Sequence, residues 1–190
     1  MTKEEVISLF KQTRALLEGH FQLSSGLHSP HYFQCARVLQ YPKNCEILCS
    51  GIANHFRDLK IDAVVGPALG GIVVAQEVGR QLHVRTMFTE RVNGTMQLRR
   101  GFECHKGERV LVCEDVLTTG GSVNEVIALI KKYNASLVGV ATIVDRSGGR
   151  AKFENLFAVI HIEVITYKPE ECPLCKQAVP VEKPGSRYLN

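Results

Sequence analysis

Four stretches of the chain repeat apolar residues every three or four positions, which is the spacing of one helix face. They are residues 3–18, the segment that follows Pro42, residues 70–82 and residues 123–133. We expect Gly19 to end the first helix, because glycine readily adopts the left-handed conformation found just after helix ends. The pattern therefore predicts four helices.

Five short runs are apolar at nearly every position and alternate with these helices. They are residues 62–67, 84–89, 110–113, 137–145 and 156–165. Strands that are apolar on both sides and separated by helices indicate a parallel sheet covered on both faces. We therefore predict an α/β fold with a doubly wound, mostly parallel sheet. In such sheets ligands bind at the carboxyl ends of the strands.

The composition is that of an ordinary globular protein, with 45% hydrophobic and 22% charged residues among 190. We find no repeat, low-complexity tract or linker and expect one domain over residues 1–190. A net charge of +4 suits an anionic ligand but is too small and scattered for nucleic acid.

No apolar run approaches the roughly 18 residues of a membrane span, and the start lacks the features of a signal peptide. Seven cysteines, an odd number lying mostly in apolar segments, indicate a reduced, cytoplasmic protein.

The stretch VLVCEDVLTTGGS (110–122) carries the most specific chemistry. Residues 118–122 offer backbone N–H groups and hydroxyls at the start of a helix, an arrangement that binds phosphate. Glu114 and Asp115 can accept hydrogen bonds from sugar hydroxyls and help to hold a hydrated Mg²⁺. Together they indicate a sugar phosphate, although one acid capping the turn beside a solvated one is the alternative. Neither the nucleotide P-loop pattern nor a GxGxxG dinucleotide fingerprint is present.

Three further loops each allow two interpretations. GPALGG (66–71) is either an ordinary tight turn between strand and helix or a second glycine-rich binding loop. ERVNGTMQLRRG (90–101) is either a solvated hairpin or a mobile basic flap that closes over an anion. In DRSGG (145–149), Arg146 either pairs with Asp145 on the surface or presents its planar fork to a ligand carboxylate.

The CPLC stretch (172–175) has half the spacing of a zinc knuckle. A structural zinc site needs four ligands, and the chain has no second CxxC. His161 could contribute but falls within an apolar strand. The alternative is a proline-containing turn with reduced thiols, so no residue is assigned as a direct metal ligand.

Residues 110–122 resemble the signature of the type I phosphoribosyltransferases. In that family the two acids bind the ribose hydroxyls of phosphoribosyl pyrophosphate and the loop binds its 5-phosphate. GPALGG resembles the family's pyrophosphate loop, and the arginine-rich segment resembles a flap that closes over the leaving pyrophosphate. The resemblance implies these residues for the phosphoribosyl pyrophosphate, with Asp115 and Arg91 catalytic: Leu69, Gly70, Arg91, Glu114, Asp115, Val116, Leu117, Thr118, Thr119, Gly120, Gly121 and Ser122.

FQLSSGLHSPHYFQ (21–34) resembles the small hood over the base pocket of orotate phosphoribosyltransferases, and the tail ECPLCKQAVPVEKPGSR is also similar. The hood would cover about residues 19–40 and the flap about 90–102. The resemblance assigns Arg146 to the orotate carboxylate and places Thr118 near the base. It implies transfer of phosphoribosyl to orotate in pyrimidine (UMP) biosynthesis, giving orotidine 5'-phosphate and pyrophosphate. It also implies Mg²⁺ held mainly through the substrate and a homodimer with shared active sites.

The chain departs from many members of that family. They carry lysine at the positions of Ser24 and Gly70, and their flap lysines and histidine are replaced here by other residues, among them Val92, Thr95 and Gln97. The chain looks more like a short-flap subgroup with GPA-x-GG and LRRGF.

Two other functions are compatible with the signature. One is phosphoribosyl transfer to another base, which the arginine of DRSGG and the hood disfavour because a neutral purine offers no carboxylate. The other is a non-catalytic regulator that senses phosphoribosyl pyrophosphate while binding nucleic acid. A chain of 190 residues with a charge of +4 leaves little room for that second surface.

Overall fold

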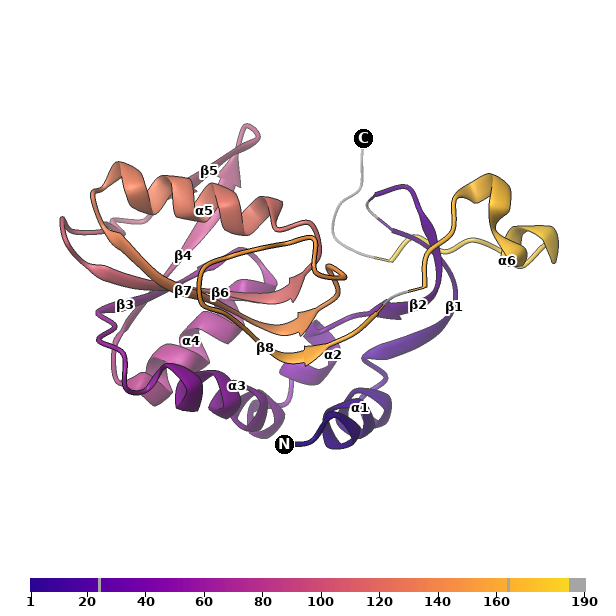
Figure 1. Ribbon diagram of the computed structural model, residues 1–190, viewed down its shortest axis with the longest axis horizontal. Coiled ribbons are helices and arrows are strands. Elements are labelled where there is room, and N and C mark those ends of the chain that lie inside the picture. The colour runs from indigo at the N-terminus through magenta and orange to yellow at the C-terminus, as the bar shows by residue number, and fades with distance from the viewer. Residues whose placement is uncertain (24, 164, 185–190) are drawn as a thin grey trace.

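The computed structural model describes residues 1–23, 25–163 and 165–184, and six strands within these ranges form one sheet (Figure 1). In sheet order the strands are β5 (Thr95–Leu98), β4 (Arg85–Val92), β3 (Ala63–Pro67), β6 (Arg109–Leu117), β7 (Ser136–Asp145) and β8 (Leu156–His161). Every neighbouring pair is parallel except the β4–β5 hairpin. The predicted mostly parallel sheet is confirmed.

Helices cover both faces of this sheet (Figure 1). The helices and the remaining strands are α1 (Lys3–Gln12), β1 (Leu16–Gln22), β2 (His28–Phe33), α2 (Ala36–Leu39), α3 (Pro42–Phe56), α4 (Gly70–Leu82), α5 (Gly121–Lys132), the 3₁₀ helix η1 (Pro169–Glu171) and α6 (Pro173–Lys176). Alternate strand residues face opposite layers: Val64 and Leu111 pack against α3 and α4, whereas Val65 and Val112 pack against α5. Within the described ranges, no helix has the length and apolar character needed to cross a bilayer.

The first predicted helix is wrong in its second half. Helix α1 begins with a capping box formed by Thr2 and Glu5 and ends at Gln12. Arg14 then adopts a left-handed conformation with φ of 53°, which reverses the chain. Gly19, expected to end the helix, lies inside β1 instead. The apolar residues after position 14 suit a strand as well as a helix, because two adjacent leucines carry no distinguishing period.

Strand β6 continues past the predicted end at residue 113. Its pairing with β7 includes Glu114 opposite Thr142 and Val116 opposite Val144, so the two acids belong to the strand itself. The longer β7 supplies backbone partners that keep this segment extended. Strand β8, in contrast, ends at His161 rather than at residue 165.

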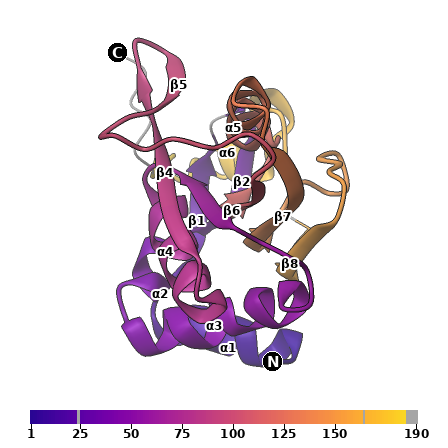
Figure 2. The same cartoon turned by 90° about the vertical axis from the view of Figure 1, so that its left-hand side faces the viewer.

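The hood is an antiparallel hairpin of β1 and β2 that stands apart from the main sheet (Figure 1). The end of the chain returns to it, because Phe21 pairs with Glu182 and His28 pairs with Tyr167. The departure at Ser24 and the last residues of the tail lie outside the described ranges. Figure 2 shows the β4–β5 hairpin projecting beyond the rest of the sheet.

The turn between β3 and α4 is packed so tightly that it requires glycine. A Cβ atom on Gly66 would overlap the backbone carbonyl oxygen of Gly71. A Cβ atom on Gly71 would stand 2.8 Å from Pro67 Cδ and 3.0 Å from the Cys113 carbonyl oxygen on β6. The peptide bond between Ala68 and Leu69 is cis. The turn therefore lies directly against the strand that carries the acids.

We expect Gly66→Ala to lower the free energy of unfolding by about 1–3 kcal/mol, the usual cost of overpacking a buried site. Gly51→Ala is the matched control, because a Cβ atom in that helix would meet nothing closer than 3.9 Å. It should leave stability unchanged or raise it by up to about 1 kcal/mol through helix propensity. Thermal unfolding of both variants measures the difference, and equal melting temperatures would contradict this account of the turn.

Candidate active site

One cavity of about 500 Å³ lies where β3 and β6 end. Every position that the sequence assigned to substrate lines it: Leu69, Gly70, Arg91, Glu114, Asp115, Val116, Leu117, Thr118, Thr119, Gly120, Gly121, Ser122 and Arg146. Other residues of the predicted hood, of the tail and of α5 also line it, and none of them was assigned individually from the sequence: Gln22, Leu23, Tyr32, Phe33, Gln34, Ala36, Val123, Glu125, Lys183 and Pro184. The carboxyl ends of the strands thus gather the predicted site, as expected for an open parallel sheet.

Glu114 and Asp115 are half-buried residues of β6 at the floor of this cavity. Asp115 accepts a hydrogen bond at Oδ1 from the backbone N–H of Val116 at 2.9 Å, within the strand rather than in the turn after it. A Cβ atom on Gly70 would overlap the Asp115 carboxylate. The absence of a side chain at position 70 therefore lets this acid lie against the turn that follows β3.

Residues 118–122 connect β6 to the first turn of α5. Gly120 has φ of 77°, and a Cβ atom there would stand 2.7 Å from the ring of Phe153. The Gly121 N–H donates to Thr119 Oγ1 at 3.4 Å, and the Asn124 N–H donates to the Gly120 carbonyl. A loop of this kind at the start of a 12-residue helix presents backbone N–H groups and the positive end of the helix dipole to an anion.

Arg146 points toward the hood and not toward its sequence neighbour. Asp145 is buried and accepts from the Ser147 N–H at 2.8 Å and lies 3.1 Å from His161 Nδ1. The guanidinium of Arg146 instead lies 5.8 Å from the ring centre of Tyr32. Among the described residues, no carboxylate forms an ion pair with it. The surface Asp145–Arg146 pair considered from sequence is wrong, and the cation remains open to a ligand.

Burial shifts the pKa values of Arg146 and of Tyr32 beside it. It lowers the pKa of Arg146, although nearby Tyr32, Cys35 and Asp115 oppose this shift. Burial likewise raises the pKa of the Tyr32 hydroxyl. The arginine still stays charged, because its ordinary pKa is far above neutrality. A partly desolvated cation binds an anionic ligand more strongly than an exposed one.

The cysteines next to the acids, Cys35 and Cys113, are buried, which disfavours a nucleophilic role. Burial and the charge of Asp115 raise the pKa of Cys35 well above its ordinary value. Burial and Glu114 do the same to Cys113. Only a thiolate attacks efficiently, so both side chains act as small buried apolar groups.

Comparison with known proteins decides the family. The phosphoribosyl transferase domain model matches residues 38–169. The orotate phosphoribosyltransferase of Caldicellulosiruptor bescii is 54% identical over 188 residues, covering 98% of this chain and 99% of the relative. That of Chlorobaculum parvum is 55% identical, covering 98% and 97%. The chain belongs to the orotate phosphoribosyltransferase family.

Solved structures agree with that assignment. The crystal structure of orotate phosphoribosyltransferase from Aeropyrum pernix matches with a TM-score of 0.73 and 25% identity, covering 83% of this chain and 94% of the other. An adenine phosphoribosyltransferase from Thermoanaerobacter pseudethanolicus matches with a TM-score of 0.62 and 13% identity, covering 70% and 88%. The similarity to the adenine phosphoribosyltransferase shows that the two proteins share a fold.

The flap segment of this orotate phosphoribosyltransferase family member is the β4–β5 hairpin. Arg91 lines the cavity, where its guanidinium forms two hydrogen bonds with the Glu125 carboxylate at 2.7 and 2.9 Å. Arg99 and Arg100 pair with Glu90 on the hairpin itself and do not line the cavity. The segment forms an antiparallel hairpin, and of its three arginines Arg91 is the one that lines the cavity.

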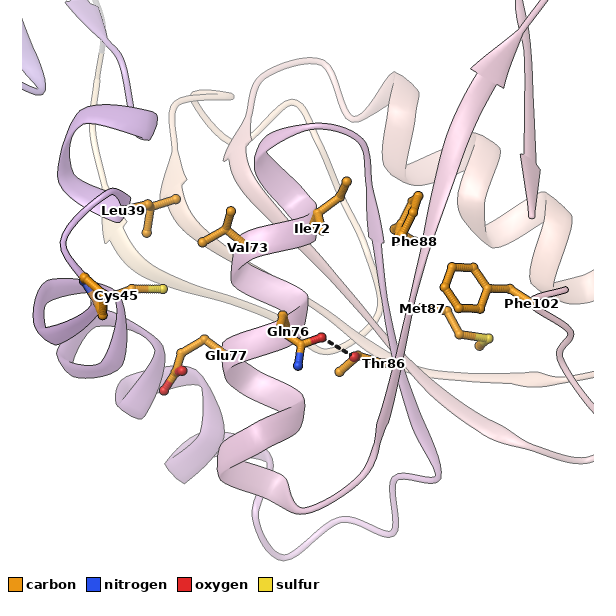
Figure 3. Close-up of a pocket in the computed structure, with 11 residues that line it drawn as sticks. Leu39, Cys45, Ile72, Val73, Gln76, Glu77, Thr86, Met87, Phe88 and Phe102 are labelled. Atoms are coloured by element: carbon orange, nitrogen blue, oxygen red, sulfur yellow. Dashed lines mark hydrogen bonds between the residues drawn. The ribbon is translucent and has the colours of Figure 1, made fainter. Parts of the chain in front are cut away.

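A second cavity, of about 430 Å³, lies between α4 and β4, away from the acids (Figure 3). Ile72 and Val73 project into it from α4, with Phe88 and Phe102 on the opposite side (Figure 3). Its lining is mainly apolar and holds no acid pair or phosphate loop.

We expect Glu125→Gln to tighten binding of pyrophosphate by up to about fivefold, because it frees Arg91 from an ion pair worth at most about 1 kcal/mol. Arg91→Ala should weaken the same binding. Glu46→Gln, which removes an exposed ion pair with Arg80 far from the cavity, should change nothing. Isothermal titration with pyrophosphate compares the three variants. Equal pyrophosphate affinities for wild type and Arg91→Ala would show that Arg91 does not contact the bound anion.

Proposed function

We propose that this protein transfers the 5-phosphoribosyl group of phosphoribosyl pyrophosphate to orotate, releasing pyrophosphate, in pyrimidine biosynthesis. The observation that carries the proposal is one cavity holding an acid pair, a phosphate loop and Arg146, a cation without an ion-pair partner among the described residues. A sugar phosphate and an anionic base need these three features together. Membership in the orotate phosphoribosyltransferase family supports the same reaction.

The donor would lie along the β6 end of the cavity. Residues 118–122 hold the 5-phosphate, and Glu114 and Asp115 accept hydrogen bonds from the ribose hydroxyls. The backbone of Leu69 and Gly70 faces the diphosphate. Because the β3–α4 turn is packed against Asp115, the ribose and its leaving group are held at a fixed separation.

The reaction forms a bond between a ring nitrogen of orotate and C1 of the ribose. The C1–oxygen bond breaks, and its electron pair leaves with the diphosphate. The reacting ring nitrogen releases its proton, which water or the departing diphosphate can accept, so no protein base is assigned to this step. The carboxylates stabilise the cation-like ribose, and Arg91 stabilises the departing charge after exchanging Glu125 for the diphosphate. Positioning and preorganised charge, rather than a covalent intermediate, lower the barrier.

The residues of the cavity fit a magnesium ion. Glu114 and Asp115 offer carboxylate oxygens, which Mg²⁺ prefers, but two acids cannot fill its coordination shell. Phosphate and hydroxyl oxygens of the substrate and water would complete that shell, as is usual for this ion at phosphate sites. When bound, the ion neutralises negative charge on the diphosphate.

Arg146 would bind the carboxylate of orotate through its planar fork, with Thr118 beside the base. Tyr32 of the hood lies against the guanidinium and limits its movement. Discrimination against neutral bases follows, because a purine leaves this partly buried cation without a partner.

The protein would act as a cytoplasmic homodimer that binds no nucleic acid. The apolar cavity between α4 and β4, beside the 43% exposed Val73, supports an interface there. The projecting β4–β5 hairpin carries Arg99 and Arg100 outside its own cavity, which supports an arginine contribution to a neighbouring site. Such a dimer would share its active sites.

Orotate absorbance should fall only when protein, phosphoribosyl pyrophosphate and Mg²⁺ are all present.

We expect Asp115→Asn to lower kcat by roughly 10²–10³-fold, the cost of removing one preorganised charge contact. Asp58→Asn, an exposed acid after α3, is the control and should turn over like wild type. An unchanged rate in Asp115→Asn would refute the role of the carboxylate pair. Turnover of another base but not orotate would refute the assignment of Arg146, and no turnover with any base would favour the sensor.

Arg146→Gln should raise the KM for orotate by about 10- to 150-fold, the value of a charge-assisted hydrogen bond of 1.5–3 kcal/mol. The KM for phosphoribosyl pyrophosphate should change little, because the donor lies on the other side of the cavity. Arg150→Gln, at an exposed position of the same loop, is the matched control. Steady-state kinetics with each substrate varied in turn give the comparison. Equal increases in both KM values would place Arg146 outside the base pocket.

A further inference from the structure

Four potential metal ligands converge where the hood meets the end of the chain. They are His20 and His28 of the hairpin and Cys172 and Cys175 of the CPLC stretch, and their ligand atoms all lie within 4.8 Å of one another. Three of the four side chains are buried, with relative exposures of 2% for His20, 6% for His28 and 0% for Cys172. Cys175 closes the cluster from the solvent side.

Three of the distances between these atoms match the edges of a tetrahedral site. His20 Nε2 lies 3.5 Å from Cys172 Sγ and 3.7 Å from Cys175 Sγ, and His28 Nδ1 lies 3.3 Å from Cys175 Sγ. Bond lengths of about 2.3 Å to sulfur and 2.0–2.1 Å to nitrogen give tetrahedral edges of roughly 3.3–3.8 Å. The two ring nitrogens are 2.8 Å apart, a hydrogen-bond distance that would widen by about half an ångström around an ion.

The orientation of His20 is set by a second contact. Its Nδ1 lies 2.8 Å from the carbonyl oxygen of Val179. A carbonyl only accepts, so Nδ1 is the ring nitrogen that donates to it, and Nε2 is the ring nitrogen that faces the two thiols. This is the usual arrangement around a metal-binding histidine, in which the second ring nitrogen donates to an outer partner.

The backbone holds the two halves of the cluster together without relying on the side chains. The His28 and Tyr167 backbones exchange hydrogen bonds of 2.8 and 2.9 Å. Gln22 N–H donates to the Glu182 carbonyl at 2.8 Å, and Glu182 N–H donates to the His20 carbonyl at 2.8 Å. The ligand positions are therefore preorganised by two bridges that flank them.

We propose that His20, His28, Cys172 and Cys175 bind one zinc ion that has a structural role. Two thiolates and two imidazoles in a closed tetrahedral set select zinc over harder ions. His161, the partner considered from sequence, is engaged with Asp145 instead. The site joins segments 152 positions apart and so fixes the hood against the tail.

The proposed zinc site would stabilise one wall of the substrate cavity without lining it. Gln22 and Leu23 follow His20 in the hood, and Lys183 and Pro184 follow the second bridge in the tail, and all four line the cavity. The ion itself touches no reacting atom. Its loss would loosen one wall of the cavity while leaving the acid pair and phosphate loop in place.

Metal content of the purified protein tests the site, and this measurement does not depend on the proposed reaction. We expect about one zinc per chain by mass spectrometry in wild type and in Cys104→Ser, a buried thiol elsewhere in the core. Cys175→Ser, which alters the exposed ligand, should lower zinc affinity by at least about tenfold and reduce the bound zinc after dialysis. His28→Ala should do the same.

A second measurement keeps the test valid if a variant fails to fold. Wild type stripped with a chelator and titrated with Co²⁺ should develop the intense visible absorption of a tetrahedral cobalt–thiolate centre, and added Zn²⁺ should abolish it. The melting temperature should fall in chelator for wild type and Cys104→Ser but not for Cys175→Ser.

Three results would overturn the proposal. The first is wild type that carries no zinc and gives no cobalt absorption. The second is a Cys172–Cys175 disulfide in the protein purified without oxidant, since oxidised sulfur cannot ligate the ion. The third is stoichiometric iron in place of zinc.

Discussion

The site depends on the close contact between the β3–α4 turn and strand β6. Gly70 has no side chain, and the Asp115 carboxylate occupies the space that a Cβ atom would need. Gly71 stands against the Cys113 carbonyl in the same way. Because these contacts involve backbone on at least one side, they fix the turn relative to the acids more rigidly than side-chain packing would. A ligand that spans both loops meets a preformed site and loses little energy to rearrangement.

The base end of the cavity is built from more distant parts of the chain. Asp145 is committed to Ser147 and His161, which leaves the Arg146 guanidinium to lie against Tyr32. The hood thus forms one wall of the cavity beside Arg146, while the sheet carries the acids and leads into the loop of residues 118–122. If the histidine–cysteine cluster binds zinc, a metal sets the position of that wall together with the packing of Phe33 in the main core.

The spacing of apolar residues along the chain predicted the helices and strands whose formation depends on neighbouring residues. Helix α4 spans the predicted residues 70–82, and the acids and both glycine-rich loops meet in one cavity because parallel strands end at one edge. The predicted first helix is too long, because Arg14 adopts a left-handed conformation that redirects the chain. The Arg91–Glu125 pair and the approach of His20 to Cys172 join residues far apart in sequence, so no spacing could reveal them. Of the four residues in the histidine–cysteine cluster, only the two cysteines of CPLC could be recognised from their spacing in the sequence.

The most direct test of the account is a crystal structure of the protein with orotidine 5'-phosphate. The account predicts the phosphate on residues 118–122, the ribose hydroxyls within hydrogen-bond distance of Glu114 and Asp115, and the base carboxylate on Arg146. The base should lie beneath Tyr32 and the hood. A product bound with its phosphate at the β3–α4 turn, or with its carboxylate away from Arg146, would contradict the assignment of both ends of the cavity.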